Sequence, residues 1–182
     1  MWATCNVGAT KPEEFGLYFA WGETEGYTAE DVSAGKKEFA WDDYKFGTTD
    51  NLTKYNATDG LVALELEDDA AYQSDNTCRI PTRAELEELR ANTTSTWETL
   101  NGVNGRRFTS KTNGNSIFVP AAGNCGNGTV DYVGSKCFLW SSSLYESKFS
   151  RAWSLNFGAD GVDMGKYGRC VGSSVRAVQD PK

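Results

Sequence analysis

The side chains that most often perform enzyme chemistry are unevenly represented in this sequence. Its 182 residues include no histidine, which removes Ser-His-Asp and Cys-His catalysis together with imidazole metal ligands. Any catalytic group would be a carboxylate, Cys, Tyr or Lys. Glu13, Glu14, Glu23 and Glu25 offer carboxylate pairs of the kind that glycosidases use, but any acidic chain offers such pairs, so the signal is weak.

Two acidic segments bear some similarity to the ligand sets of hard cations. The run ELEDDAA at residues 65–71 clusters carboxylates, which Ca²⁺ and Mg²⁺ prefer, although such a run is more often the solvated face of a helix. Asp160 and Asp163 lie in GADGVDMG, which lacks the spacing and the terminal Glu of a calcium loop. We therefore predict no metal site and no cofactor.

The five cysteines are Cys5, Cys78, Cys125, Cys137 and Cys170, and no two of them form a C-x-x-C motif. A zinc or thioredoxin-like site is therefore not indicated. If the protein is exported, Cys125 and Cys137 form a plausible local disulfide across a Gly/Asn-rich loop. Buried or incidental thiols are the favoured interpretation at this low cysteine density.

Charge and hydropathy exclude two classes of partner. The net charge is −7 and no run of Lys and Arg offsets it, which argues against binding to nucleic acid or to an anionic membrane. The longest apolar stretches, SIFVPAA and LVALEL, are far shorter than the ~20 residues of a spanning helix. Met1 is followed directly by WATCNVGA, without the apolar core of a signal peptide. We therefore expect no nucleic-acid partner and no direct membrane insertion.

Length and composition predict a single domain over residues 1–182, in which helices precede a β-rich half. EEFGLYFAWGE (13–23) is aromatic and typical of a strand. The polar segment after it is expected to be a long ordered excursion, pinned by Trp41, Tyr44, Phe46 and Tyr55.

Two helices are predicted. Asp59 is a candidate N-cap for a helix through LVALELEDDAAYQ (61–73). PTRAELEELR (81–90) carries a stronger signal, because Thr82 and Glu85 have the spacing of a capping box and are followed by leucines on one face.

The second half is predicted to be antiparallel β-structure. RRFTSKT (106–112) and SIFVPAA (116–122) flank Asn113-Gly114, a pair that favours a tight hairpin turn. Further strands are expected over 137–143, 151–157 and 173–178. The layout is that of an α+β protein with irregular loops.

The stretch 152–171 alternates between two kinds of side chain. In the first strand the alternate residues Trp153, Leu155 and Phe157 are apolar and predicted to face a core, and in the following stretch Val162 and Met164 are predicted to do so. The residues between them are predicted to face outward, namely Ser154, Asn156 and Gly158 in the first strand and Asp163, Gly165 and Tyr167 in the following stretch. Tyr, Ser, Gly and Asn are the residues of antibody paratopes, although any surface β-loop is also rich in Gly, Ser and Asn.

Several segments together resemble a large family of bacterial exported and phage-borne domains with a C-type-lectin-like fold, related to the formylglycine-generating enzyme. They are WATCNVGA, YFAWGE, CRIPTRAELEEL, NGNSIFVPAAG and the ending from LWSSSLYES to GSSVRAV. The resemblance covers nearly the whole chain. It implies a C-type-lectin-like α+β fold with two helices, antiparallel sheets and long irregular loops.

Within that family the ending resembles the variable proteins of diversity-generating retroelements, in which an error-prone reverse transcriptase randomises adenines in selected codons. The resemblance implies a variable ligand-binding region over residues 145–171. Its expected sites are Tyr145, Phe149, Ser150, Arg151, Ser154, Asn156, Gly158, Gly161, Asp163, Gly165, Tyr167, Gly168 and Cys170. Trp153, Leu155, Phe157, Met164, Arg169 and the GSSVRAV strand would be scaffold. The typical target codon does not yield Lys, which sets Lys166 apart from the variable sites.

The expected function is therefore that of a non-enzymatic receptor or adhesion protein that binds a protein or glycan on a cell or phage surface. Its expected location is extracellular, on the cell surface or on a phage particle. The alternatives are a non-variable exported adhesion domain of the same fold, or an oxidase related to the formylglycine-generating enzyme, which needs a redox-active cysteine pair. The WND and EPN motifs of calcium-dependent lectins are absent, so calcium-dependent sugar binding is not implied.

Overall fold

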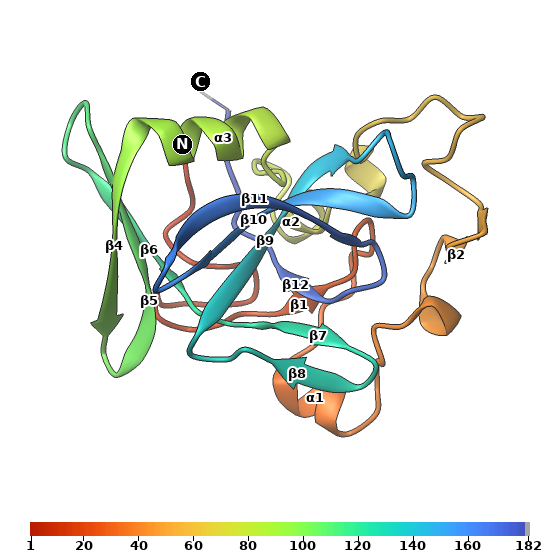
Figure 1. The fold of residues 1–182 in the computed structure, drawn as a ribbon, viewed down its shortest axis with the longest axis horizontal. Helices are drawn as coiled ribbons and strands as arrows, with labels where there is room; N and C mark the ends of the chain where they lie inside the picture. Colours follow the sequence, from red (N-terminus) through yellow and green to blue (C-terminus); the bar gives the residue numbers. More distant parts are fainter. Residues whose placement is uncertain (181–182) are drawn as a thin grey trace.

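The computed structural model describes residues 1–180 as an α+β fold with few helices and several sheets (Figure 1). This confirms the predicted fold class at that level. In the larger sheet the strands follow the order β1 (Tyr18–Phe19), β12 (Ser173–Ser174), β9 (Lys136–Leu144), β10 (Arg151–Gly158) and β11 (Gly161–Gly168). Neighbouring strands are antiparallel except β12 and β9, which are parallel.

The polar, glycine-rich segment 161–168 is a regular edge strand. It pairs with β10 along its whole length, from Gly161 opposite Gly158 to Gly168 opposite Arg151. The predicted strands at 137–143 and 151–157 are confirmed as parts of β9 and β10. The predicted strand at 13–23 is reduced to β1.

The smaller sheet consists of β4 (Thr93–Leu100), β5 (Val103–Ser110) and β6 (Ser116–Pro120) in that order. Its β5–β6 hairpin confirms the predicted one, with a five-residue connection in which Gly114 has a φ of 74°. Two ribbons complete the β-structure: β2 (Gly47–Thr48) with β3 (Asn51–Leu52), and β7 (Asn124–Gly126) with β8 (Thr129–Asp131).

The longest helix, α3 (Arg83–Asn92), begins as its sequence predicts. Thr82 Oγ1 accepts a hydrogen bond from the Glu85 amide at 3.2 Å, and the Glu85 carboxylate accepts one from the Thr82 amide at 2.7 Å. Leu86 and Leu89 are buried. The helix packs across β9 and β10 and also contacts β4 and β5 (Figure 1).

The predicted helix at 61–73 with Asp59 as N-cap is wrong. The Asp59 carboxylate instead accepts the amides of Asn56 and Leu61 and closes a turn. The helix begins at Ala70, nine residues after the predicted start, because the buried Asp69 accepts the amides of its first turn. The short helical segments are α1 (Ala29–Ser33), η1 (Trp41–Asp43), η2 (Leu66–Asp68) and α2 (Ala70–Ser74).

Both faces of the larger sheet are covered over part of its area. On one face α3 and the smaller sheet enclose a cluster formed by Leu86, Leu89, Phe108, Val119, Cys137, Leu139, Leu155 and Phe157. On the other face the loops of residues 18–55 enclose a larger cluster that includes Trp21, Phe39, Tyr55, Trp140, Leu144 and Ala152. We call this second covering the loop layer. The sheet therefore separates two apolar cores.

The beginning and the end of the described chain run side by side. The Ala3 amide donates to the Ala177 carbonyl at 2.9 Å, and Arg176 is fully buried beneath this contact. Its guanidinium donates to Asn6 Oδ1 and to the carbonyls of Ala3 and Phe118. Burial lowers the pKa of Arg176 to about 10, which leaves it charged at neutral pH.

The loop layer is attached to the end of β11 by Arg169, which is also fully buried. Its guanidinium carbon lies 4.9 to 5.7 Å from the ring centroids of Trp21, Tyr44, Phe46 and Tyr55. Tyr44, Phe46 and Tyr55 are themselves buried, which confirms that aromatic rings hold the long excursion in place. Cation–π attraction is strongest where the cation is desolvated, as it is here.

Oxygen atoms complete the environment of Arg169. The guanidinium donates to the Tyr44 hydroxyl at 2.9 Å and to the carbonyls of Lys54, Tyr55 and Phe149 at 3.0 to 3.1 Å. No carboxylate of residues 1–180 forms an ion pair with it. The charge is held by carbonyl and hydroxyl dipoles and by aromatic faces.

Replacing Arg169 by Met, which has a similar length, should lower the free energy of unfolding by ~3–5 kcal/mol, because three buried carbonyls and a hydroxyl lose their donor. Urea unfolding measures the change. Arg151→Met, at an exposed arginine of β10, is the matched control and should change stability by less than about 0.5 kcal/mol. Equal effects of the two substitutions would contradict the assigned role of Arg169.

Candidate functional site

The pairing of β10 with β11 sorts their side chains onto two faces. Leu155 opposite Met164, and Phe157 opposite Val162, share the face that packs against α3 and the smaller sheet. Asn156 lies opposite Asp163 on the other face, as do Ser154 opposite Gly165 and Ala152 opposite Tyr167. This confirms the predicted alternation. Lys166 lies opposite Trp153, on the face away from Tyr167.

The face that carries Asn156 is open only at one end. Ala152 and Ser154 are fully buried there, and Ala152 belongs to the core that the loop layer encloses. The expectation that Ser154 faces solvent is therefore wrong, and its hydroxyl donates to Asn156 Oδ1 at 2.7 Å instead. Beyond Ser154 the loop layer ends and the sheet surface becomes accessible.

An open cleft of about 660 Å³ lies at this uncovered end. Five of the predicted site residues line it, namely Asn156, Gly158, Gly161, Asp163 and Tyr167. The residues that sequence reasoning missed are Asn124, Tyr132, Lys136, Phe138, Phe157, Asp160 and Val162. We call this the β10–β11 cleft.

Aromatic side chains from three segments line the β10–β11 cleft. Phe138 of β9 lies between Tyr167 and Tyr132, with ring centroids 5.1 and 6.1 Å away, respectively. Tyr132 is 53% exposed and has a φ of 63°, a conformation that is costly for a bulky residue. Residues held in sparsely populated backbone conformations cluster at active sites and ligand clamps. An apolar pair, Tyr132-Val133, in the turn before β9 is the sequence signal that would have indicated this wall.

Charged groups stand at the rim of the cleft. Lys136 Nζ lies 4.8 Å from the Tyr132 ring centroid. Asp160 and Asp163 are exposed, and the Asp163 carboxylate accepts a hydrogen bond from the Met164 amide and lies 3.6 Å from Arg90. The cleft thus combines an aromatic floor with amide, carboxylate and ammonium groups at its edge, an arrangement suited to binding.

The remaining predicted site residues do not line the cleft. Gly165 lies beside it, beneath the side chains of Asn156 and Tyr167. Arg151 and Gly168 are paired at the far end of the hairpin. Ser150 and Cys170 are buried and Phe149 packs against the larger core, which corrects the expectation that these three are displayed. Backbone hydrogen bonds explain this placement. The Arg169 guanidinium donates to the Phe149 carbonyl and the Arg169 amide donates to the Ser150 carbonyl, which holds this segment against the larger core.

Tyr145 belongs to a stack around Trp153 on the opposite face. The Arg83 guanidinium lies 3.8 Å from the Trp153 ring centroid and Lys166 Nζ lies 4.8 Å from it, while Tyr145 meets the ring edge-on at 5.3 Å. Trp153 is only half-buried and belongs to neither core, so its prediction as a core residue is wrong. The Trp153 ring is thus contacted by two cations and by the edge of Tyr145, and it is not enclosed by aliphatic core residues.

The acidic run at 65–71 holds an ammonium group. Lys54 Nζ lies 2.6 to 2.7 Å from the carboxylates of Glu65, Glu67 and Asp68, which are the only three in residues 1–180 close enough to share a metal ion. Asp68 also contacts Lys45. Because an internal cation already satisfies these oxygens, the cluster reads as a structural salt-bridge network.

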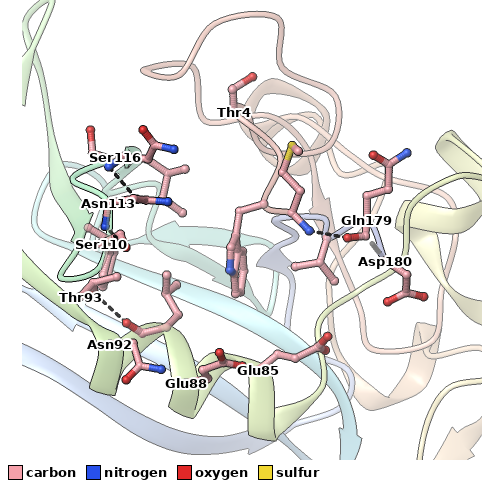
Figure 2. Close-up of a pocket in the computed structure, with 17 residues that line it drawn as sticks. Thr4, Glu85, Glu88, Asn92, Thr93, Ser110, Asn113, Ser116, Gln179 and Asp180 are labelled. Carbon is pink, nitrogen blue, oxygen red and sulfur yellow. Dashed lines mark hydrogen bonds between the residues drawn. The ribbon is translucent and has the colours of Figure 1, made fainter. Parts of the chain in front are cut away.

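A second cleft, of about 590 Å³, lies between the N-terminal segment, α3 and the β5–β6 hairpin (Figure 2). Glu85 and Glu88 of α3 line one side of it, and Asn113 and Ser116 of the hairpin line another. None of the predicted site residues belongs to it.

The five cysteines are free thiols in this structure. Burial raises the pKa of Cys125 and of Cys137 to about 12, and that of Cys170 to about 11. A thiol with so high a pKa carries almost no thiolate at neutral pH and is a poor nucleophile. The Cys125–Cys137 disulfide considered from the sequence is not formed.

No protein-family model, curated protein or solved structure matches the chain. In the described part of the chain, no helix has the length and hydropathy needed to cross a membrane.

Native alkylation should distinguish the two kinds of thiol. Iodoacetamide at pH 8 is expected to label Cys5 and Cys78, which are partly exposed, and to leave the three buried cysteines unmodified. Mass spectrometry of tryptic peptides measures the result, with denatured protein as the fully labelled control. Labelling of Cys170 in the folded protein would show that the end of β11 opens.

Trp153→Ala should lower the free energy of unfolding by only about 1–2 kcal/mol, because the lost contacts are cation–π and edge-on contacts at a half-exposed site. Trp140→Ala is the matched control in the larger core and should cost ~3–5 kcal/mol. Denaturant unfolding of both variants is the measurement. A Trp153 effect as large as that of Trp140 would restore Trp153 to the core.

Proposed function

We propose that this chain is a non-enzymatic binding protein that displays a diversified ligand-binding surface on a C-type-lectin-like scaffold. One observation carries the proposal. Five residues expected to vary line a single open cleft, while Leu155, which alternates with them, is buried in the core between the larger sheet, α3 and the smaller sheet. The resemblance to variable proteins of diversity-generating retroelements comes from the sequence, and the cleft is consistent with it.

The geometry of the hairpin explains how such a surface can change without loss of the fold. A side chain at 156, 163 or 167 points away from the core that holds Leu155 and Met164. Because β10 and β11 are held by backbone hydrogen bonds, which are the same for every residue except proline, many side chains are compatible with the pairing.

The ligand is proposed to be a protein or glycan on a cell or phage surface. Tyr167 and Tyr132 offer amphipathic area of the kind that dominates binding energy, and Phe138 supplies a buried floor between them. The cleft would thus have a constant wall from β8–β9 and an exchangeable wall from β10–β11. Nucleic acid remains an unsuitable partner because the net charge is −7.

Two alternative functions make different demands on the chain. A formylglycine-generating oxidase would need a redox-active cysteine pair, whereas burial raises the pKa of Cys125, Cys137 and Cys170 far above neutrality, which leaves Cys5 and Cys78 as the two partly exposed thiols. A non-variable adhesion domain of the same fold would show the same cleft without diversification. An extracellular, cell-surface or phage-particle location follows from either binding function.

Sequencing the coding DNA of many sibling genes from one population tests the proposal. We expect substitutions at template adenines in the codons for residues 156, 158, 161, 163 and 167, and silence at 155, 157 and 169, whose side chains are buried. A region 145–171 without substitutions, or substitutions spread equally over both faces of the hairpin, would contradict diversification.

A further inference from the structure

Gly165 occupies the centre of β11, directly beneath two residues of the β10–β11 cleft. A Cβ atom added to Gly165 would lie 2.0 Å from Asn156 Nδ2 and 2.8 Å from Tyr167 Cε2. Real Cβ contacts are essentially never shorter than 3.0 Å, so at least one of these side chains would have to move. The backbone of Gly165 does not have a positive φ, so it would accept a side chain. Glycine is required here by its neighbours.

The Asn156 amide that fills this space also links two other groups. Its Oδ1 accepts the hydrogen bond from the fully buried Ser154 hydroxyl at 2.7 Å, and its Nδ2 donates to the Tyr167 hydroxyl at 3.4 Å. Removing the amide from the space above Gly165 therefore leaves the Ser154 hydroxyl without its acceptor. A buried polar group without a partner is destabilising.

We propose that residue 165 is the specificity-determining position of the β10–β11 cleft, because it sets the side-chain conformations of Asn156 and Tyr167. With glycine, the Asn156 amide lies flat against β11 and holds the Tyr167 hydroxyl. With any larger residue, the amide swings into the cleft and Tyr167 loses this contact, so two lining residues change their positions together. The inference rests on the ligand-binding function proposed above for its biological meaning, whereas the side-chain coupling stands on geometry alone.

A double-substitution cycle tests the coupling without a ligand. Gly165→Ala should lower the melting temperature by about 2–6 °C, because the buried Ser154 hydroxyl loses its acceptor. Asn156→Ala should lower it by a similar amount for the same reason. In the Asn156→Ala background the change at 165 should cost clearly less than in the unsubstituted protein, because the contact with the Asn156 amide is already lost and only the Tyr167 ring, at 2.8 Å, has to move. The side-chain NH₂ resonances of Asn156 should shift in Gly165→Ala.

Gly168 provides the matched control in the same strand. A Cβ atom there would have no neighbour closer than 3.7 Å, and its φ is not positive. Gly168→Ala should therefore leave both the melting temperature and the Asn156 resonances unchanged. Equal losses from Gly165→Ala in the two backgrounds, unmoved Asn156 resonances, or an equal effect of Gly168→Ala would each overturn the inference. If sibling genes carried no substitutions in these codons, diversification would be refuted, but the coupling between residue 165 and the Asn156 side chain would be unaffected.

Discussion

The position of the β10–β11 cleft depends on one buried charge. Taking the guanidinium of Arg169 out of water costs several kcal/mol, and no carboxylate in the described residues offsets it. Aromatic faces and carbonyl oxygens from the loop layer compensate instead, and they do so only when that layer is folded onto the end of β11. Tyr167 of β11 lies two residues before Arg169, which directly follows the strand. The interaction that closes the larger core therefore also fixes one wall of the cleft.

Sequence reasoning succeeded where the determining interactions are local. The capping box of Thr82 and Glu85 lies within four residues, and the alternation along β10 and β11 follows from strand geometry. It failed where a competing local contact was equally available. Asp59 and Asp69 both have the chemistry of an N-cap, and the choice between them depends on the tertiary packing that buries Asp69.

Only the part of the candidate site on β10 and β11, where apolar and polar residues alternate, could be predicted from the sequence. The burial of Ala152 and Cys170 depends on a covering layer formed by residues 18–55, more than 90 residues away in sequence. Tyr132 and Phe138 reach the cleft from β8–β9, and no periodicity links them to Tyr167. Trp153 is predicted to lie in a core because it alternates in step with Leu155 and Phe157. In the structure its ring contacts Arg83, Lys166 and the edge of Tyr145 instead.

Two apolar cores on opposite faces of one sheet explain why this surface is free to vary in some places and constrained in others. Asp163 is 82% exposed in its side chain and belongs to neither core, and apart from strand pairing its one charged contact is the exposed ion pair with Arg90 at 3.6 Å. Ser154 and Gly165 lie one row further in, where the loop layer and the Asn156 amide leave no space. Side chains at the rim therefore change the chemistry of the cleft, whereas residues at its base change its shape. Under the proposed function, recognition of different ligands with one fold would need both kinds of position, and this hairpin places them in adjacent rows.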